Sequence, residues 1–226
     1  MKAKFFTFFR ISLLFMLIIP ALAEAQNDEK TETLVLAAQK TFNNFRADPD
    51  MGWFRNNVKT AKGVFIVPSL LKAGFIFGGS GGNGVLLAHD ENTGQWSYPA
   101  FFTMGAGSFG FQAGVEKAEV ILMVLTQKGM DSMLSTSFKL GADVTVAAGP
   151  VGAGAKFQMV DILAFSRSKG IYGGISLEGA VITPRDARNE AYYGKPCRSV
   201  DILIRHSVTN PQADPLRAVV AHTTGK

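Results

Sequence analysis

The sequence is poor in the side chains that metal centres, disulfide frameworks and most hydrolytic sites need. Its 226 residues include one cysteine and three histidines. A single thiol excludes an intramolecular disulfide framework and a multi-thiolate metal site. Charged residues make up 18% of the chain and hydrophobic residues 47%, which excludes a disordered or collagen-like polymer. A chain of this length can bury a sizeable core in one or two domains.

Long apolar runs are also scarce, and the one near the start is typical of a secretory signal. Three cations precede an apolar stretch at 11–19, which Pro20 ends, and small residues suited to cleavage follow up to Ala25. The stretch is shorter than the about 20 residues that span a bilayer. The sequence therefore predicts a cleaved signal peptide at 1–25 and a periplasmic or secreted location. No cysteine lies near the end of this run, so no lipid-modified N-terminus is expected.

Removal of that segment lowers the formal net charge from +5 to +3, because it takes away Lys2, Lys4, Arg10 and Glu24. A nucleic-acid-binding domain requires a strongly basic face or stripe. No nucleic-acid partner is therefore expected.

Glycine is absent from the first 51 residues and frequent afterwards, which divides the chain into two zones. In the first zone, at about 28–60, apolar residues recur at helical spacing. The sequence Asp48-Pro49-Asp50 predicts the end of one helix, and Asp50 is expected to cap a second short helix that runs through Lys59.

The glycine-rich zone predicts a succession of short strands bounded by turn residues. Residues 90–94 are expected to form a hairpin loop, and helical pieces are expected near 128–135 and 185–192. Glycines inside strands indicate bulges, corners or close backbone approach. The expected strands are 64–67, 74–77, 84–89, 96–102, 120–126, 143–148, 157–165 and 171–182.

These patterns predict an α+β fold with N-terminal helices on a glycine-rich, strongly curved, mainly antiparallel β-sheet, barrel-like or sandwich-like. One domain is expected at 26–209, followed by a loose C-terminal tail at 210–226.

Two glycine-rich stretches resemble nucleotide-binding signatures, but neither has the required context. The stretch 78–84 lacks the lysine and following helix of a phosphate-binding loop, so a flexible turn between strands is expected. The glycines at 105, 107 and 110 match the dinucleotide spacing, but poor helix formers follow them. A phosphate-contacting loop at Gly79, Ser80, Gly81 and Gly82 is kept as a second candidate site.

Catalytic constellations are equally weak in this sequence. Ser80 lies between glycines, but the surrounding sequence does not predict the strand-to-helix turn of a nucleophile elbow. The three histidines show no metal-ligand spacing, and Cys197 is expected to be a small, partly buried apolar residue. We expect no catalytic residue, no metal and no cofactor.

The segment 53–62 combines aromatic and basic residues in the pattern of an interfacial helix. Arg55, Lys59 and Lys62 recur at helical spacing, and Trp53 lies at the start of the segment. Aromatic rings enter the headgroup region of a membrane, and cations meet anionic lipid. These four residues are the candidate lipid-binding site. The alternative is a solvated face above an apolar stripe that packs on the sheet.

Short motifs follow one another along most of the chain. They begin with Ala61–Pro68 (AKGVFIVP) and end with Asn189–Gly194 (NEAYYG), with others at 74–79, 82–86, 94–101, 110–114, 140–143, 148–152 and 170–179. In sequence and in order, these motifs resemble those of the SYLF domain family. The resemblance implies a non-enzymatic module that binds anionic phospholipid, including phosphatidylinositol lipids, at a membrane surface. Eukaryotic members of the family are linked to phosphoinositide membranes and to actin bundling. The alternative is an envelope protein that binds a protein partner or has a structural role, and the sequence leaves the oligomeric state open.

Overall fold

The computed structural model describes residues 30–74, 77–109, 114–152, 159–168, 170–173 and 177–223. The predicted signal peptide at 1–25 lies outside these residues. So do parts of the predicted strands and family motifs, at 75–76, 110–113, 157–158 and 174–176.

The N-terminal zone is helical, as predicted. Residues 30–47 form a first helix, which ends at Asp48. The cap of the next turn is Asp48 rather than the predicted Asp50, because the Asp48 side chain accepts a hydrogen bond from the Asp50 amide. Three short helical pieces follow: η1 (Pro49–Met51), α2 (Gly52–Asn57) and η2 (Val58–Thr60).

The described strands form one ten-stranded sheet, in which β7 and β8 run parallel and the other pairs antiparallel. Its order is β6-β10-β4-β2-β1-β5-β8-β7, with β3 paired to β2 and β9 paired to β8. The strands are β1 (Gly63–Gly74), β2 (Phe77–Asp90), β3 (Gln95–Trp96), β4 (Ala100–Phe109), β5 (Gly114–Val124), β6 (Phe138–Lys139), β7 (Val146–Ala148), β8 (Ile162–Ser168), β9 (Ile171–Gly173) and β10 (Val181–Pro184).

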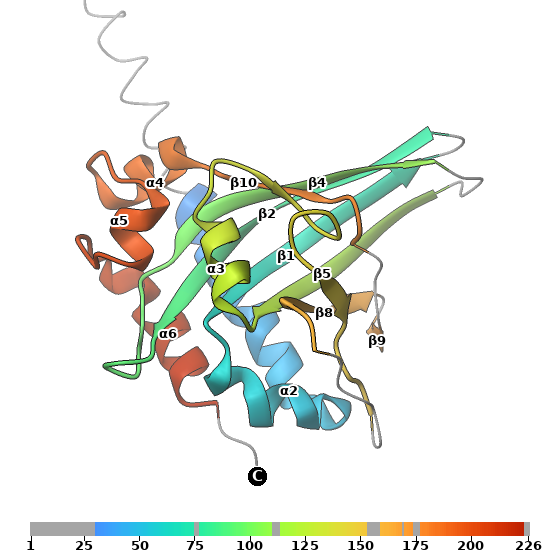
Figure 1. Cartoon of the computed structure of the whole chain (residues 1–226), viewed down its shortest axis with the longest axis horizontal. Helices are drawn as coiled ribbons and strands as arrows, with labels where there is room; N and C mark the ends of the chain where they lie inside the picture. Colours follow the sequence, from blue (N-terminus) through green and yellow to red (C-terminus); the bar gives the residue numbers. More distant parts are fainter. Residues whose placement is uncertain are drawn as a thin grey trace, which may run out of the picture.

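Helices cover both faces of this sheet at one end. The remaining helices are α3 (Gln127–Met133), α4 (Asp186–Tyr193), α5 (Ser199–Leu203), η3 (Pro211–Ala213) and α6 (Asp214–Ala221). One face, which we call the N-helix face, packs with the first helix, α2 and α6. The other, the α3 face, packs with α3 and α5. Figure 1 shows β1, β2, β4 and β5 running beyond all the labelled helices, so their far ends lack a helical cover. The predicted α+β class, with leading helices on a curved sheet, is confirmed.

Two glycines of β2 allow a close approach by an irregularity in β1, as the glycine density predicted. The register of β1 shifts between Val67 and Leu70. A Cβ atom on Gly82 would lie 2.7 Å from the Ser69 carbonyl oxygen, and one on Gly84 would lie 2.4 Å from that of Ile66. Only glycine fits at these positions without moving the neighbouring backbone.

Two sequence predictions about irregular segments are wrong. Residues 78–84 form the middle of the long strand β2 and not a turn, because β1 and β4 pair with it on both sides. The C-terminal residues 211–221 are helical and not a loose tail, because Leu216 and Val220 are buried in the N-helix core. The predicted hairpin loop at 90–94 is confirmed: β2 and β3 flank it, and Gly94 adopts a φ of 69°.

A buried carboxylate joins three segments at the edge of the α3 face. Asp161, just before β8, accepts hydrogen bonds from the Thr126 hydroxyl at 2.6 Å and from the amide and hydroxyl of Thr145 at 2.9 Å each. Lys128 Nζ lies 3.5 Å away. Burial raises the pKa of Asp161, but these hydrogen bonds and the lysine outweigh it and hold the pKa at about 2.

Replacing Asp161 by asparagine should therefore destabilise the fold by about 2 kcal/mol at neutral pH. Since the folded pKa lies below the unfolded value, the stabilisation is complete above about pH 4 and disappears as the pH falls towards 2. Urea unfolding of both proteins at several pH values measures this difference. Asp131→Asn, on an exposed residue, is the matched control and should have little effect at any pH. A pH-independent difference for Asp161→Asn would contradict the prediction.

Candidate functional site

Trp53, the aromatic residue of the predicted lipid-binding segment, lies in α2 and is partly packed into the protein. Its ring stacks on Phe165 of β8, with ring centroids 6.3 Å apart and planes tilted by 26°. The neighbouring Phe54 is fully buried and contacts the same ring edge-on at 5.3 Å. Both aromatic residues therefore fasten α2 to the sheet.

Arg55 binds the end of the first helix. Its Nη1 donates to the carbonyl oxygens of Arg46, at 3.2 Å, and Asp48, while Nη2 donates to that of Pro49 at 3.4 Å. Carbonyl groups at a helix C-terminus lack partners within the helix and carry partial negative charge. The guanidinium of Arg55 satisfies these groups, which is a structural role.

The two lysines of the segment differ in their surroundings. Lys62 forms an ion pair with Glu91 of the hairpin loop, with Nζ and Oε2 2.7 Å apart. Lys59 is exposed, and no hydrogen bond or ion pair joins its side chain to any other described residue. The helix is α-helical only through Asn57 and becomes a 3-10 turn over 58–60. The structure thus leaves one of the three predicted cations free of a role in the fold. Membrane contact by the segment stays a prediction.

The second predicted site, at Gly79–Gly82, lies within β2. Ser80 lies directly opposite Lys72 of β1 and Ala106 of β4. The peptide groups of this segment face paired strands on both sides, so they do not form the predicted phosphate-contacting loop. The strand setting of Ser80 also differs from the sharp strand-to-helix turn of a nucleophile elbow.

A row of residues that sequence reasoning missed crosses the uncovered end of the N-helix face. Val181, Gly105, Gly81, Leu71 and Lys117 lie directly opposite one another on five neighbouring strands, β10, β4, β2, β1 and β5. We call these five residues the far-end row. Leu71 is 51% exposed and Val181 40% exposed, although both are apolar. A Cβ atom on Gly81, between Val181 and Leu71 in the row, would meet nothing within 4 Å, so no described atom lies close above the backbone there.

The far-end row therefore combines exposed apolar side chains with one exposed cation, Lys117. On the opposite face, Lys72 lies directly across from Glu116. No periodic signal could have found the row, because the register shift in β1 decides which residue of β5 faces Leu71.

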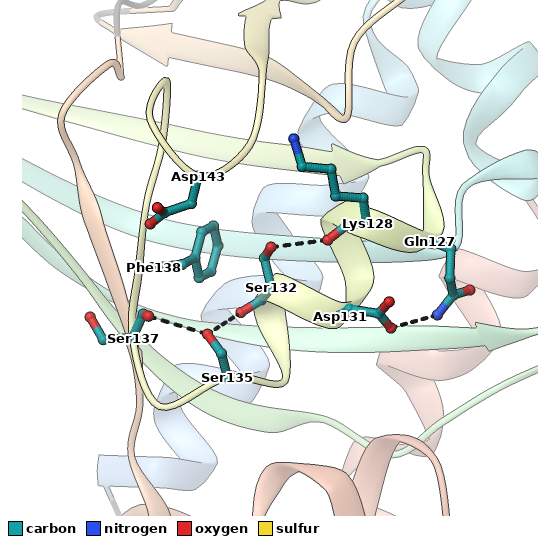
Figure 2. A pocket seen from close by; sticks show the side chains of 8 residues that line it. All are labelled: Gln127, Lys128, Asp131, Ser132, Ser135, Ser137, Phe138 and Asp143. Carbon is teal, nitrogen blue, oxygen red and sulfur yellow. Dashed lines mark hydrogen bonds between the residues drawn. The ribbon is translucent and has the colours of Figure 1, made fainter.

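A shallow hollow of about 550 Å³ lies beside α3 and β6. It is lined by Gln127, Lys128, Asp131, Ser132, Ser135, Ser137, Phe138 and Asp143. In Figure 2 the hydroxyls of Ser132 and Ser135 point to backbone carbonyls, to which they donate at 3.0 Å and 2.7 Å. A nucleophilic serine instead needs a base to accept its proton. The lining contains no histidine.

Other reactive groups are similarly occupied or buried. Burial raises the pKa of the Cys197 thiol to about 11, with a contribution from Asp201, so this buried thiol is protonated at neutral pH. Within the described ranges, no three His, Cys, Asp or Glu side chains are close enough to share a metal ion. Also within those ranges, no helix has the length and hydrophobicity needed to cross a bilayer.

Residues 105–223 match a protein family described as "Ysc84: Las17-binding protein actin regulator". Protein YSC84 of Saccharomyces cerevisiae is 34% identical to this chain over 171 residues, which cover 72% of this chain and 36% of the yeast protein. LAS seventeen-binding protein 3 of the same yeast is also 34% identical over 171 residues, and these cover 37% of that relative.

A mammalian relative gives a weaker match of similar extent. The SH3 domain-containing YSC84-like protein 1 of Bos taurus is 29% identical over 175 residues, which cover 75% of this chain and 51% of the bovine protein. The chain therefore matches about a third of the length of the yeast relatives and about half of the bovine one. The family match at 105–223 includes Gly105, Lys117 and Val181 of the far-end row, and β1 and β2 lie before it.

Proposed function

Because this chain belongs to the Ysc84 family, whose shared unit is the SYLF domain, we propose that it binds anionic phospholipid at a membrane surface and converts no substrate. The observation that carries the proposal is the far-end row, where apolar and cationic side chains lie together on an uncovered sheet face. Two observations support the part of the proposal that concerns catalysis. The buried Cys197 thiol is protonated at neutral pH, and the hydroxyls of Ser132 and Ser135 donate hydrogen bonds to backbone carbonyls.

The chemistry of the row matches the interface of a bilayer. Leu71 and Val181 bring apolar area to the acyl boundary, at about 25 cal/mol per Å² removed from water. Lys117 meets anionic headgroups, at about 1 kcal/mol per cation near the surface. The glycine floor between the side chains lets lipid approach the sheet closely. A single patch of this size predicts weak, reversible and salt-sensitive binding.

Charge reversal at the end of the row tests the proposal. Lys117→Glu removes one attraction and adds one repulsion, about 2 kcal/mol together, so the affinity for phosphatidylglycerol-containing vesicles should fall about thirtyfold. Vesicle co-sedimentation at low salt measures this affinity, with phosphatidylcholine vesicles as the uncharged reference. Lys59→Glu is the matched control, because Lys59 is also exposed but lies in the segment that sequence alone selected.

Comparing the two variants locates the contact, and the unaltered chain tests whether lipid binding occurs. Loss of binding in Lys59→Glu with full binding in Lys117→Glu would move the contact to the segment 53–62. Absence of binding to any vesicle by the unaltered chain would contradict lipid binding as a whole.

A second candidate function is the binding of a protein partner. It is favoured by the description of the matching family and by the name of LAS seventeen-binding protein 3, both of which state binding to Las17, and by the 34% identity to that relative. Recovery of one stoichiometric protein partner, with no vesicle binding, would favour this candidate. With the sequence signal at 1–25, the proposed place of action for either function is the periplasm or the cell exterior.

A further inference from the structure

The strand β4 continues beyond its neighbour β10 and leaves one backbone edge without a partner in the described part of the chain. β10 pairs only with residues 102–105 of β4, whereas β2 accompanies β4 over 100–109. Ala180, the residue just before β10, does not continue the pairing with β4. Its carbonyl oxygen accepts a hydrogen bond from the Leu140 amide, next to β6, at 2.9 Å. In Figure 1, β4 runs on past β10. Residues 106–109 therefore offer unpaired backbone donors and acceptors on one side.

This edge lacks the features that usually protect a sheet from pairing with another chain. Such features are charged side chains, proline and bulges. The edge reads Ala106-Gly107-Ser108-Phe109, and its register with β2 is regular. By contrast, the β5 edge at 114–117 includes Glu116 and Lys117, and the outermost strand β7 is three residues long and precedes Pro150.

We propose that the β4 edge pairs with the same edge of a second copy of the chain, antiparallel and with Gly107 opposite its counterpart. Two-fold dimers, in which the same surface of each subunit meets its counterpart, are the commonest homo-oligomers. Since no residue of this edge is charged, the symmetry brings no like charges together. In this register, residue 106 of each copy lies opposite residue 108 of the other.

Position 107 can accept a larger side chain within a single copy. A Cβ atom on Gly107 would meet nothing within 4 Å among the described residues. The edge is short, which predicts a reversible dimer whose population rises with concentration.

Sedimentation of the purified chain in lipid-free buffer over a concentration series tests the proposal. We expect a monomer–dimer equilibrium that weakens on the order of tenfold in Gly107→Lys and in Gly107→Glu, because like charges then meet at the axis. An equimolar mixture of the two variants should restore association. Gly81→Lys is the matched control: it also faces open space on the N-helix face, but β2 is an interior strand, so association should be unchanged.

Hydrogen exchange provides a measurement that needs no variant. The amides of residues 106–109 should exchange more slowly as the concentration of the unaltered chain rises. The proposal is overturned if the chain stays monomeric and this exchange does not depend on concentration. It is also overturned if Gly81→Lys weakens association as much as Gly107→Lys does, since the face and not the edge would then form the contact.

Discussion

Replacing Gly84 by alanine is expected to lower the free energy of unfolding by about 3 kcal/mol, at the upper end of the range for overpacking. The added methyl group would lie 2.4 Å from the Ile66 carbonyl oxygen and 2.7 Å from the Phe65 ring. The backbone of Ile66 cannot move aside easily, because β1 is paired with β2 on one side and with β5 on the other. Urea unfolding followed by circular dichroism measures the change.

Gly81→Ala is the matched control for this substitution. Gly81 lies on the same strand but faces open space, with nothing within 4 Å of an added Cβ atom. Alanine there should leave stability unchanged or raise it by up to about 1 kcal/mol, because it restricts the unfolded chain. If Gly84→Ala were as stable as Gly81→Ala, the close approach of β1 to β2 would not exist in solution.

Phe54→Ala should cost about 3–5 kcal/mol, the usual loss when a buried phenylalanine is truncated. Phe54 is fully buried, and its ring contacts those of Phe42 at 5.5 Å, Phe45 at 6.2 Å and Phe165 at 5.3 Å. Truncation therefore removes the contact that joins the first helix, α2 and β8. Thermal and urea unfolding both report the loss.

Lys59→Ala, five residues further along the same segment, is the comparison. Its side chain is exposed, so its removal should change stability by less than about 0.5 kcal/mol. A small loss in Phe54→Ala would show that the segment 53–62 is peripheral and available to a membrane, as the sequence pattern predicted. A large loss supports its role in fastening the first helix to the sheet.

The parts of the fold that depend on local chemistry were predicted well. The helix break at Asp48-Pro49 and the loop at 90–94 follow from turn residues that act within a few positions. The helices near 128–135 and 185–192 correspond to α3 and α4. The fold class, the leading helices and the two helices α3 and α4 could therefore be predicted from the sequence.

The features that the sequence did not predict depend on contacts between segments far apart in the chain. The glycines at 78–84 predict a turn on local preference, but neighbours on both sides hold them in β2. The local sequence pattern likewise suggests that Arg55 and Lys62 are free cations. In the fold, Arg55 binds the end of the first helix and Lys62 pairs with Glu91, and a local pattern does not show these contacts. Turn residues at 210–211 and Pro215 led to the prediction of a loose tail after 209. The apolar face of α6 was therefore not recognised.

The far-end row was missed for a similar reason. Leu71 and Lys117 meet only because β1 and β5 pair antiparallel, and an irregularity in β1 shifts their register. One residue of slip would move each side chain to the opposite face. Single-sequence patterns do not fix such a register.

The strand order also bears on how the chain assembles. β1 and β2 are adjacent in sequence and lie at the centre, while β4 and β5, also consecutive, add to opposite sides of that hairpin. Closing the short hairpin loses less chain entropy than joining residues as distant as Gly63 and Val124. The central hairpin is thus the natural nucleus, and β4 and then β5 can dock on it in the order in which they leave the ribosome. Synthesis and folding would then proceed in the same direction, with the slow long-range step last.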